Sequence, residues 1–281
     1  MKGWLKALLF FVAWIVTQVL VTAPVMYFRA KYGIEQNDSF VFWMTFITYT
    51  IQLATTLGIA AIFIKYIDKT KFVDLGFRLR KRWSHLAFGL LGGFVFISLG
   101  SGILILLGAI TIQDVHFIPV SQLLWIVLFA MVAVNEETFA RGYLLRALME
   151  STGKYWALLI SAIVFAGLHG LNPNMSWIAM INLLIAGILL GVYYIHFKNL
   201  WFSIGIHLTW NYFQGPVWGY HVSGTTTSGI FTLQESGSTL INGGEFGFEG
   251  SLVCTIMMLV AIVAIDLWAR REKRKEELIV E

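Results

Sequence analysis

Charged residues are scarce in this sequence. Asp, Glu, Lys and Arg make up 13% of its 281 residues, whereas about 25% is usual in soluble globular domains. Hydrophobic residues make up 58%, and the mean hydropathy is +0.74. This composition predicts an all-α polytopic membrane protein rather than a soluble one, because apolar runs of about 20 residues cross a bilayer as helices.

Cysteine is almost absent as well. The single cysteine, Cys254, lies in a late apolar run, which excludes an intrachain disulfide and a cysteine-based metal cluster. The net charge of +4 is not accompanied by any RNA- or DNA-binding motif. We therefore expect neither redox chemistry nor a nucleic-acid partner.

Long apolar runs are separated by Gly, Asn, Pro and charge clusters, and they predict eight membrane-spanning helices. The first run is longer than the core of a signal peptide and is not followed by a small-residue cleavage pattern, so we expect it to be retained. The eight predicted segments are 4–28, 40–66, 84–110, 120–149, 155–171, 175–197, 199–217 and 251–269.

The distribution of Lys and Arg predicts the orientation in the membrane. With eight spans and a cytoplasmic N-terminus, all but two of the twenty Lys and Arg residues, Arg29 and Lys31, fall in cytoplasmic segments. Since positive residues accumulate in cytoplasmic loops, we expect both termini in the cytoplasm. The basic stretch from Lys65 to Arg82 either only sets this topology or also lies along the anionic leaflet.

The longest predicted outer loop runs from Pro216 to Ser251, has no Lys or Arg and ends in GGEFGFEGS. Its Gly, Ser and Thr residues are typical of a flexible linker. Its aromatic residues Phe231, Phe246 and Phe248 would instead suit a folded cap over a cavity. Both interpretations remain open.

A few ionisable and amide side chains lie inside the predicted spans. Each ionisable one costs roughly 2.5–3.5 kcal/mol on insertion, so each indicates a functional site. They are Glu136 and Glu137 in the segment 120–149, His169 near the end of 155–171, and His207 with Asn211 in 199–217.

Helical spacing predicts which of these side chains share a face. Glu137 and Arg141 are four residues apart and can form an ion pair, which lowers the cost of burying either charge. Glu136 points about 100° away and is left free. His207 and Asn211 share a face and can both donate hydrogen bonds to one point.

The residues form three ordered motifs: EExxxR at Glu136, Glu137 and Arg141, FxxxH at Phe165 and His169, and HxxxN at His207 and Asn211. This order resembles the signature of the CPBP intramembrane proteases, a family of type II CAAX prenyl endopeptidases and of bacterial self-immunity and abortive-infection proteins. The similarity covers roughly residues 120–215. Ala140 departs from the pattern, since relatives often carry an aromatic residue there, and we expect altered packing only.

The resemblance implies a division of the chain and a set of roles. Residues 1–119 would hold the first helices and the basic loop, 120–217 the catalytic core, 218–250 the outer loop, and 251–281 the last helix and charged tail. Glu136 would be the general base, with His169 as its partner. His207 and Asn211 would form the oxyanion site, while Glu137, Arg141 and Phe165 would orient the others.

A zinc ion is the alternative to a metal-independent mechanism. Glu136, His169 and His207 are a common type of ligand set for catalytic zinc with an open position. The sequence contains no HExxH motif, and His207 shares its face with Asn211, which suits an oxyanion site better. We favour the metal-independent mechanism with no cofactor.

The expected function is therefore an intramembrane endopeptidase in a cell membrane, with a bacterial plasma membrane implied by the resemblance, acting on a membrane-proximal or lipid-anchored peptide. A noncatalytic scaffold or immunity protein is the rival interpretation. A proton-coupled transporter is a third, against which the two halves show no repeated broken-helix pattern. The aspartyl motif GxGD is missing, and Ser203 near His207 is better explained by helix packing.

Overall fold

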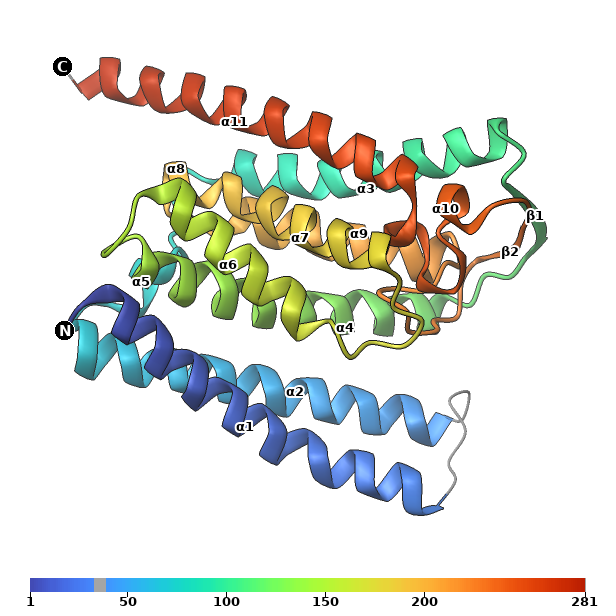
Figure 1. Cartoon of the computed structure of the whole chain (residues 1–281), viewed down its shortest axis with the longest axis horizontal. Coiled ribbons are helices and arrows are strands. Elements are labelled where there is room, and N and C mark those ends of the chain that lie inside the picture. Colours follow the sequence, from blue (N-terminus) through green and yellow to red (C-terminus); the bar gives the residue numbers. More distant parts are fainter. Residues whose placement is uncertain (33–38, 281) are drawn as a thin grey trace.

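The computed structural model describes residues 1–32 and 39–280, and helices dominate it (Figure 1). The all-α membrane fold predicted from composition fits this architecture. The α-helices are α1 Gly3–Tyr32, α2 Ser39–Ile62, α3 Trp83–Leu106, α4 Pro119–Glu137, α5 Arg146–Leu148, α6 Lys154–Leu168, α7 Trp177–Val192, α8 Tyr194–Phe197, α9 Trp201–Tyr212, α10 Thr239–Asn242 and α11 Leu252–Val280.

Six helical segments among the described residues are long and apolar enough to cross a membrane. They contain α1, α2, α3, α4, α7 and α11. The predicted spans 155–171 and 199–217 correspond to shorter helices, the 15-residue α6 and the 12-residue α9. The count of eight spans thus stays a prediction, which requires α6 and α9 to cross with the turns that flank them.

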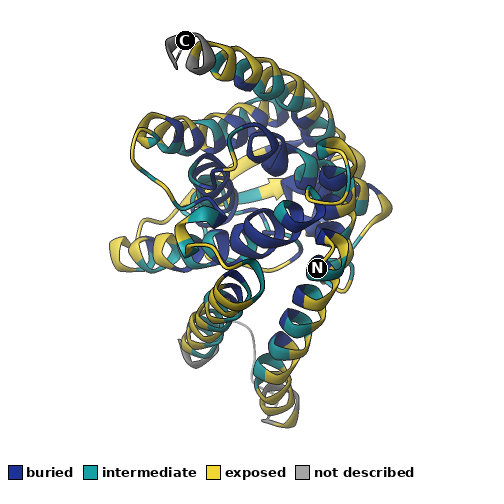
Figure 2. Cartoon of the chain, turned by 90° about the vertical axis from the view of Figure 1, so that its left-hand side faces the viewer, coloured by how far each residue is buried: buried dark blue, intermediate teal, exposed yellow. Residues whose placement is uncertain are grey.

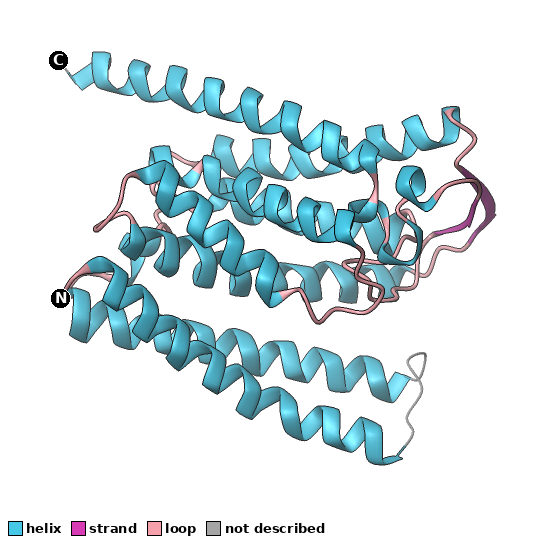
Figure 3. Ribbon diagram, viewed as in Figure 1, coloured by secondary structure: helices cyan, strands magenta, loops and turns pink. Residues whose placement is uncertain are grey.

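Both ends of the chain lie at one end of the molecule, together with α5 and α8 (Figure 1). The opposite end carries a feature that the sequence does not predict, a two-stranded antiparallel sheet of β1 Ile110–Val115 and β2 Phe231–Glu235 (Figure 3). The pairing joins Ile110 to Glu235 and Val115 to Phe231. The two strands are more than 100 residues apart in the sequence, so no turn motif between them could indicate that they pair.

The segment between α9 and α11 is folded, in agreement with the cap interpretation. Phe246 and Phe248 are buried, and the Phe248 ring packs against Gly100 of α3. The Asn182 side chain of α7 donates hydrogen bonds to the carbonyl oxygens of Glu249 and Ser251, at 2.6 and 2.9 Å. The cap is thereby held onto the central helices.

Buried residues concentrate in the central helices, while the outer helices expose apolar side chains (Figure 2). Exposed apolar surface on a helix is expected where it faces lipid. The helices α1 and α2 form a separate pair beside the others (Figure 1), linked by a 2.8 Å hydrogen bond from Trp14 Nε1 to Thr56 Oγ1.

Close packing of α3 on α9 fixes the position of the helix that carries His207 and Asn211. Three glycines lie at this contact, and a side chain at Gly93 would collide with Thr209 and with the carbonyl of Ile206. Small residues allow two helix backbones to approach closely in a membrane protein. The position of α9 therefore depends on glycine in α3.

Candidate active site

A cavity of about 280 Å³ lies inside the helical bundle. Six helices and the cap contribute to its wall: α1, α2, α4, α6, α7, α9 and the segment around Ser223 and Glu249. Five residues of the predicted site, Glu136, Phe165, His169, His207 and Asn211, line it. The three motifs, which are far apart in sequence, thus meet at one place.

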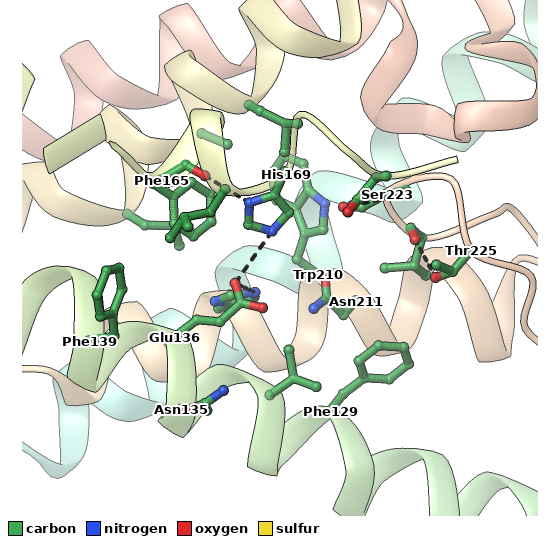
Figure 4. Close-up of a pocket in the computed structure, with 18 of the residues that line it drawn as sticks. Phe129, Asn135, Glu136, Phe139, Phe165, His169, Trp210, Asn211, Ser223 and Thr225 are labelled. Atoms are coloured by element: carbon green, nitrogen blue, oxygen red, sulfur yellow. Dashed lines mark hydrogen bonds and ion pairs between the residues drawn. The ribbon is translucent and has the colours of Figure 1, made fainter. Parts of the chain in front are cut away.

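One face of α4 presents Glu136 to the cavity. Phe129, Val132 and Glu136 line the cavity at helical spacing (Figure 4). At Glu137 the α-helix ends and a π-helix, Thr138–Leu145, continues it. Local π-helical turns inside helices are frequent at functional sites.

Glu137 and Arg141 are fully buried next to the cavity and form the predicted ion pair, with 2.9 Å between Arg141 Nη1 and Glu137 Oε1. Arg141 Nη2 also donates to the carbonyl of Gly187 at 3.0 Å. The guanidinium lies over the ring of Phe165, 4.5 Å from its centre. These contacts with Glu137, Gly187 and Phe165 offset part of the cost of burying the Arg141 charge.

His169 immediately follows α6, and Phe165 fixes its ring in two ways. The His169 Nδ1 atom lies 2.8 Å from the Phe165 carbonyl oxygen, and the two rings are 4.6 Å apart. Figure 4 shows the imidazole facing Glu136, with 3.7 Å between His169 Nε2 and Glu136 Oε2. Phe165, which the resemblance made an orienting residue, thus contacts the His169 ring directly.

His207 is held by Glu137, which the sequence did not predict. The Nδ1 atom of His207 lies 2.9 Å from Glu137 Oε1, the same oxygen that pairs with Arg141. Its other nitrogen, Nε2, lies 3.9 Å from Glu136 Oε2. The two carboxylates of the EExxxR motif therefore both lie close to histidines. Glu137 bonds His207, and Glu136 lies near His169 and His207.

The hydrogen-bond partners define where the ring protons are. A carbonyl oxygen and a carboxylate can only accept, so Nδ1 carries the proton in both His169 and His207. In a neutral imidazole the other nitrogen then presents a lone pair. Both Nε2 atoms face the Glu136 carboxylate. A neutral His169 and the carboxylate are both hydrogen-bond acceptors, so a group that donates hydrogen bonds, such as water, can lie between them.

Among the described residues, no group of three or more His, Cys, Asp or Glu side chains is arranged to hold a metal ion. The three residues named for zinc nevertheless meet here, with Glu136 Oε2 at 3.7 Å from His169 Nε2 and 3.9 Å from His207 Nε2. The metal-independent mechanism with no cofactor therefore stays a prediction from the sequence.

Glu249 of the cap is a cavity residue that the sequence reasoning missed. Its Oε1 accepts from Trp210 Nε1 at 3.0 Å, and its Oε2 accepts from the backbone N–H and the hydroxyl of Ser223 at 2.9 and 2.7 Å. Asn135, directly before Glu136, is a second. The acidic residue in GGEFGFEGS was the available signal for Glu249, whereas nothing marked Asn135.

Residues 119–213 match the family model described as Type II CAAX prenyl endopeptidase Rce1-like. We refer to this segment as the Rce1-like domain, after the family to which it is similar. No curated protein and no solved structure matches the chain. The family match confirms the resemblance to the CPBP proteases that the three motifs predicted.

The Rce1-like domain begins with α4 and ends one residue after α9, so it includes all seven motif residues. Its family is a protease family of the CAAX type. Ala140, the departure from the family pattern, is fully buried, and Phe139 stacks on Trp14 at 3.9 Å instead. The Rce1-like domain thus packs against α1, which lies outside the matched residues.

Proposed function

We propose that this chain is an intramembrane endopeptidase that hydrolyses a peptide bond in a membrane-proximal or lipid-anchored peptide. The observation that carries the proposal is the position of Glu136 Oε2 between the Nε2 atoms of two histidines, at 3.7 Å from His169 and 3.9 Å from His207. A water between Glu136 and His169 can donate one hydrogen bond to each of them. Its oxygen is then a nucleophile.

The proposed reaction balances without a further reagent. The water oxygen bonds to the scissile carbonyl carbon while Glu136 accepts a proton from the water, as a general base does. The C–N bond then breaks, and Glu136 returns the proton to the leaving nitrogen. The products are one peptide carboxylate and one peptide amine.

Asn211 and His207 are the proposed donors to the oxyanion. The Asn211 carboxamide lines the cavity and makes no hydrogen bond within the described residues, so its N–H groups are available. His207 can donate from Nε2 only as an imidazolium, because its Nδ1 proton already bonds Glu137. A protonated His207 also balances the charges of Glu136, Glu137 and Arg141, which otherwise sum to −1. Donors fixed in a water-poor cavity stabilise developing charge strongly.

The test uses the purified full chain in detergent and a fluorescein-labelled peptide that ends in a farnesylated CAAX sequence, with an unprenylated copy beside it. We expect cleavage at one bond, identified by the masses of both products. Cleavage of the unprenylated copy alone would support a peptidase without prenyl specificity.

The variant Glu136→Gln keeps the shape of the side chain and removes the base, so it should abolish this cleavage. Glu272→Gln, which removes a carboxylate of the surface pair with Lys275 on α11, is the matched control and should cleave like the wild type. Full activity of Glu136→Gln would instead favour the noncatalytic scaffold, with a contaminating peptidase as the source. A zinc enzyme would lose activity to 1,10-phenanthroline and regain it with Zn²⁺, which the proposed mechanism does not predict.

A further inference from the structure

Asn135 is a buried amide without a hydrogen-bond partner in the described part of the chain. Its side chain is 5% exposed, and its Oδ1 atom has neither a protein donor nor contact with solvent. It precedes Glu136 on α4 and lines the same cavity. In Figure 4 its amide points into the cavity below Glu136, and no dashed line reaches it. A buried polar group left unpaired costs about 1–3 kcal/mol, so a role outside the fold is indicated.

Gln122 shows what a structural amide looks like in the same helix. It is equally buried, at 6% exposed, and its Oε1, like Asn135 Oδ1, accepts no hydrogen bond from the described residues. Its Nε2, however, donates to the carbonyl of Pro216 at 3.2 Å, and Gln122 does not line the cavity. Gln122 thus ties α4 to the turn after α9. Asn135 ties α4 to nothing that the structure describes.

The helix pair α1 and α2 contributes a second amide of the same kind. Gln18 lines the cavity and its Nε2 donates to the hydroxyls of Thr55 and Thr56, at 3.3 and 3.2 Å, while its buried Oε1 accepts no hydrogen bond from the described residues. Two carboxamide oxygens among the residues that line the cavity, those of Asn135 and Gln18, therefore accept no hydrogen bond from the described residues. Such a pattern is typical of a pocket whose few polar groups orient a ligand.

We infer that the Asn135 carboxamide binds one peptide group of the substrate backbone beside the bond that Glu136 attacks. A carboxamide offers one acceptor and two donors, so an Asn135 side chain turned to bring Oδ1 to the cavity can pair with both the N–H and the C=O of a peptide unit. Peptide groups within a helix already bond to each other, so only an extended segment or a helix end can do this. The inference rests on the proposed peptidase function and adds that the bound segment is unwound.

The first test is stability, which needs no substrate. Asn135→Leu replaces an unpaired amide by an apolar group of similar shape, so its melting temperature in detergent should equal or exceed that of the wild type. Gln122→Leu leaves the Pro216 carbonyl unpaired, so it should melt at a lower temperature. If Asn135→Leu lowers the melting temperature as far as Gln122→Leu does, Asn135 is structural and the inference is wrong.

The second test is binding of the farnesylated fluorescein-labelled CAAX peptide, measured by anisotropy in the Glu136→Gln background so that turnover plays no part. We expect Asn135→Leu to weaken binding roughly 10-fold, as the loss of two hydrogen bonds would. Gln122→Leu should leave the affinity unchanged. Equal affinity with Asn135 and with leucine, or no binding of the peptide to any variant, overturns the inference.

Single ester bonds in place of backbone amides near the cleavage site identify the partner. For one ester position, Asn135→Leu should reduce the affinity less than it does with the all-amide peptide, because one of the two hydrogen bonds, that from the N–H, is already gone. An equal effect of Asn135→Leu on every ester peptide would overturn the backbone assignment. These binding results are separate from catalysis: a chain that binds in this way but never cleaves would refute the proposed function and leave this inference standing.

Discussion

Adjacent carboxylates on α4 differ in surroundings because adjacent helical residues point in different directions. Glu136 faces the cavity, whereas Glu137 is fully buried and bonds both Arg141 and His207 through one oxygen. The spacing of Glu137 and Arg141 along one helix made their pairing predictable. The bond from His207 to Glu137 was not predictable, because it depends on how α9 packs against α4.

The double role of Glu137 makes the fold depend on its charge. Glu137→Gln leaves Arg141 buried without a counter-ion, and removing one partner of a buried pair costs about 3–5 kcal/mol. We expect the free energy of unfolding in mixed micelles to fall by about that amount, together with loss of peptide cleavage. Glu150→Gln breaks the ion pair between Glu150 and Lys6. The Glu150 side chain is 37% exposed, so this change should lower the free energy of unfolding by less than about 1 kcal/mol. Equal stability of the two variants would contradict the central position of Glu137.

At the scale of helices, apolar run length predicted where most elements lie. The predicted span 84–110 corresponds to α3 and the span 251–269 to the first part of α11, because a bilayer demands long apolar segments. The sheet of β1 and β2 could not be predicted, and the contacts that hold the cap could not be either, although its aromatic residues allowed a folded cap as one of two interpretations. Their contacts join the segment after α3 to the segment after α9, and sequence patterns describe only neighbours.

Glycine in α3 controls the placement of α9. Gly93→Ala should push α9 away, because the added methyl group would collide with the Thr209 side chain and the Ile206 carbonyl. Both residues lie beside His207 in α9. We expect a lower melting temperature and reduced peptide cleavage. Gly102→Ala is the matched control, since nothing lies within 4 Å of the added methyl group in the same helix, and it should be neutral or slightly stabilising. If the two variants behave alike, the α3 contact does not position the site.

For the whole molecule, the distribution of Lys and Arg predicts which end of the helical bundle lies on the cytoplasmic side of the membrane. The N-terminus, the basic segment after α2 and the end of α11 lie together, with the sheet and cap at the other end (Figure 1). Termini at one end agree with an even number of spans, whether six or eight. The side of the membrane remains a prediction from the distribution of Lys and Arg.

Single introduced cysteines can test this orientation. The native Cys254 is fully buried, so it should not react with a membrane-impermeant maleimide. In intact cells we expect Ser236→Cys, after β2, to be labelled from outside, and Thr70→Cys, after α2, to be labelled only once the membrane is opened. Both positions are exposed. The reverse pattern would contradict cytoplasmic termini.

The most direct measurement of the central claim is the ratio of kcat between the wild type and Glu136→Gln on the farnesylated CAAX peptide. General-base catalysis contributes about 10²–10⁴-fold, so we predict a loss of at least about 100-fold with the fold intact. A Glu136→Gln variant that cleaves within about twofold of the wild-type rate would show that Glu136 does not activate the water, and would contradict the account.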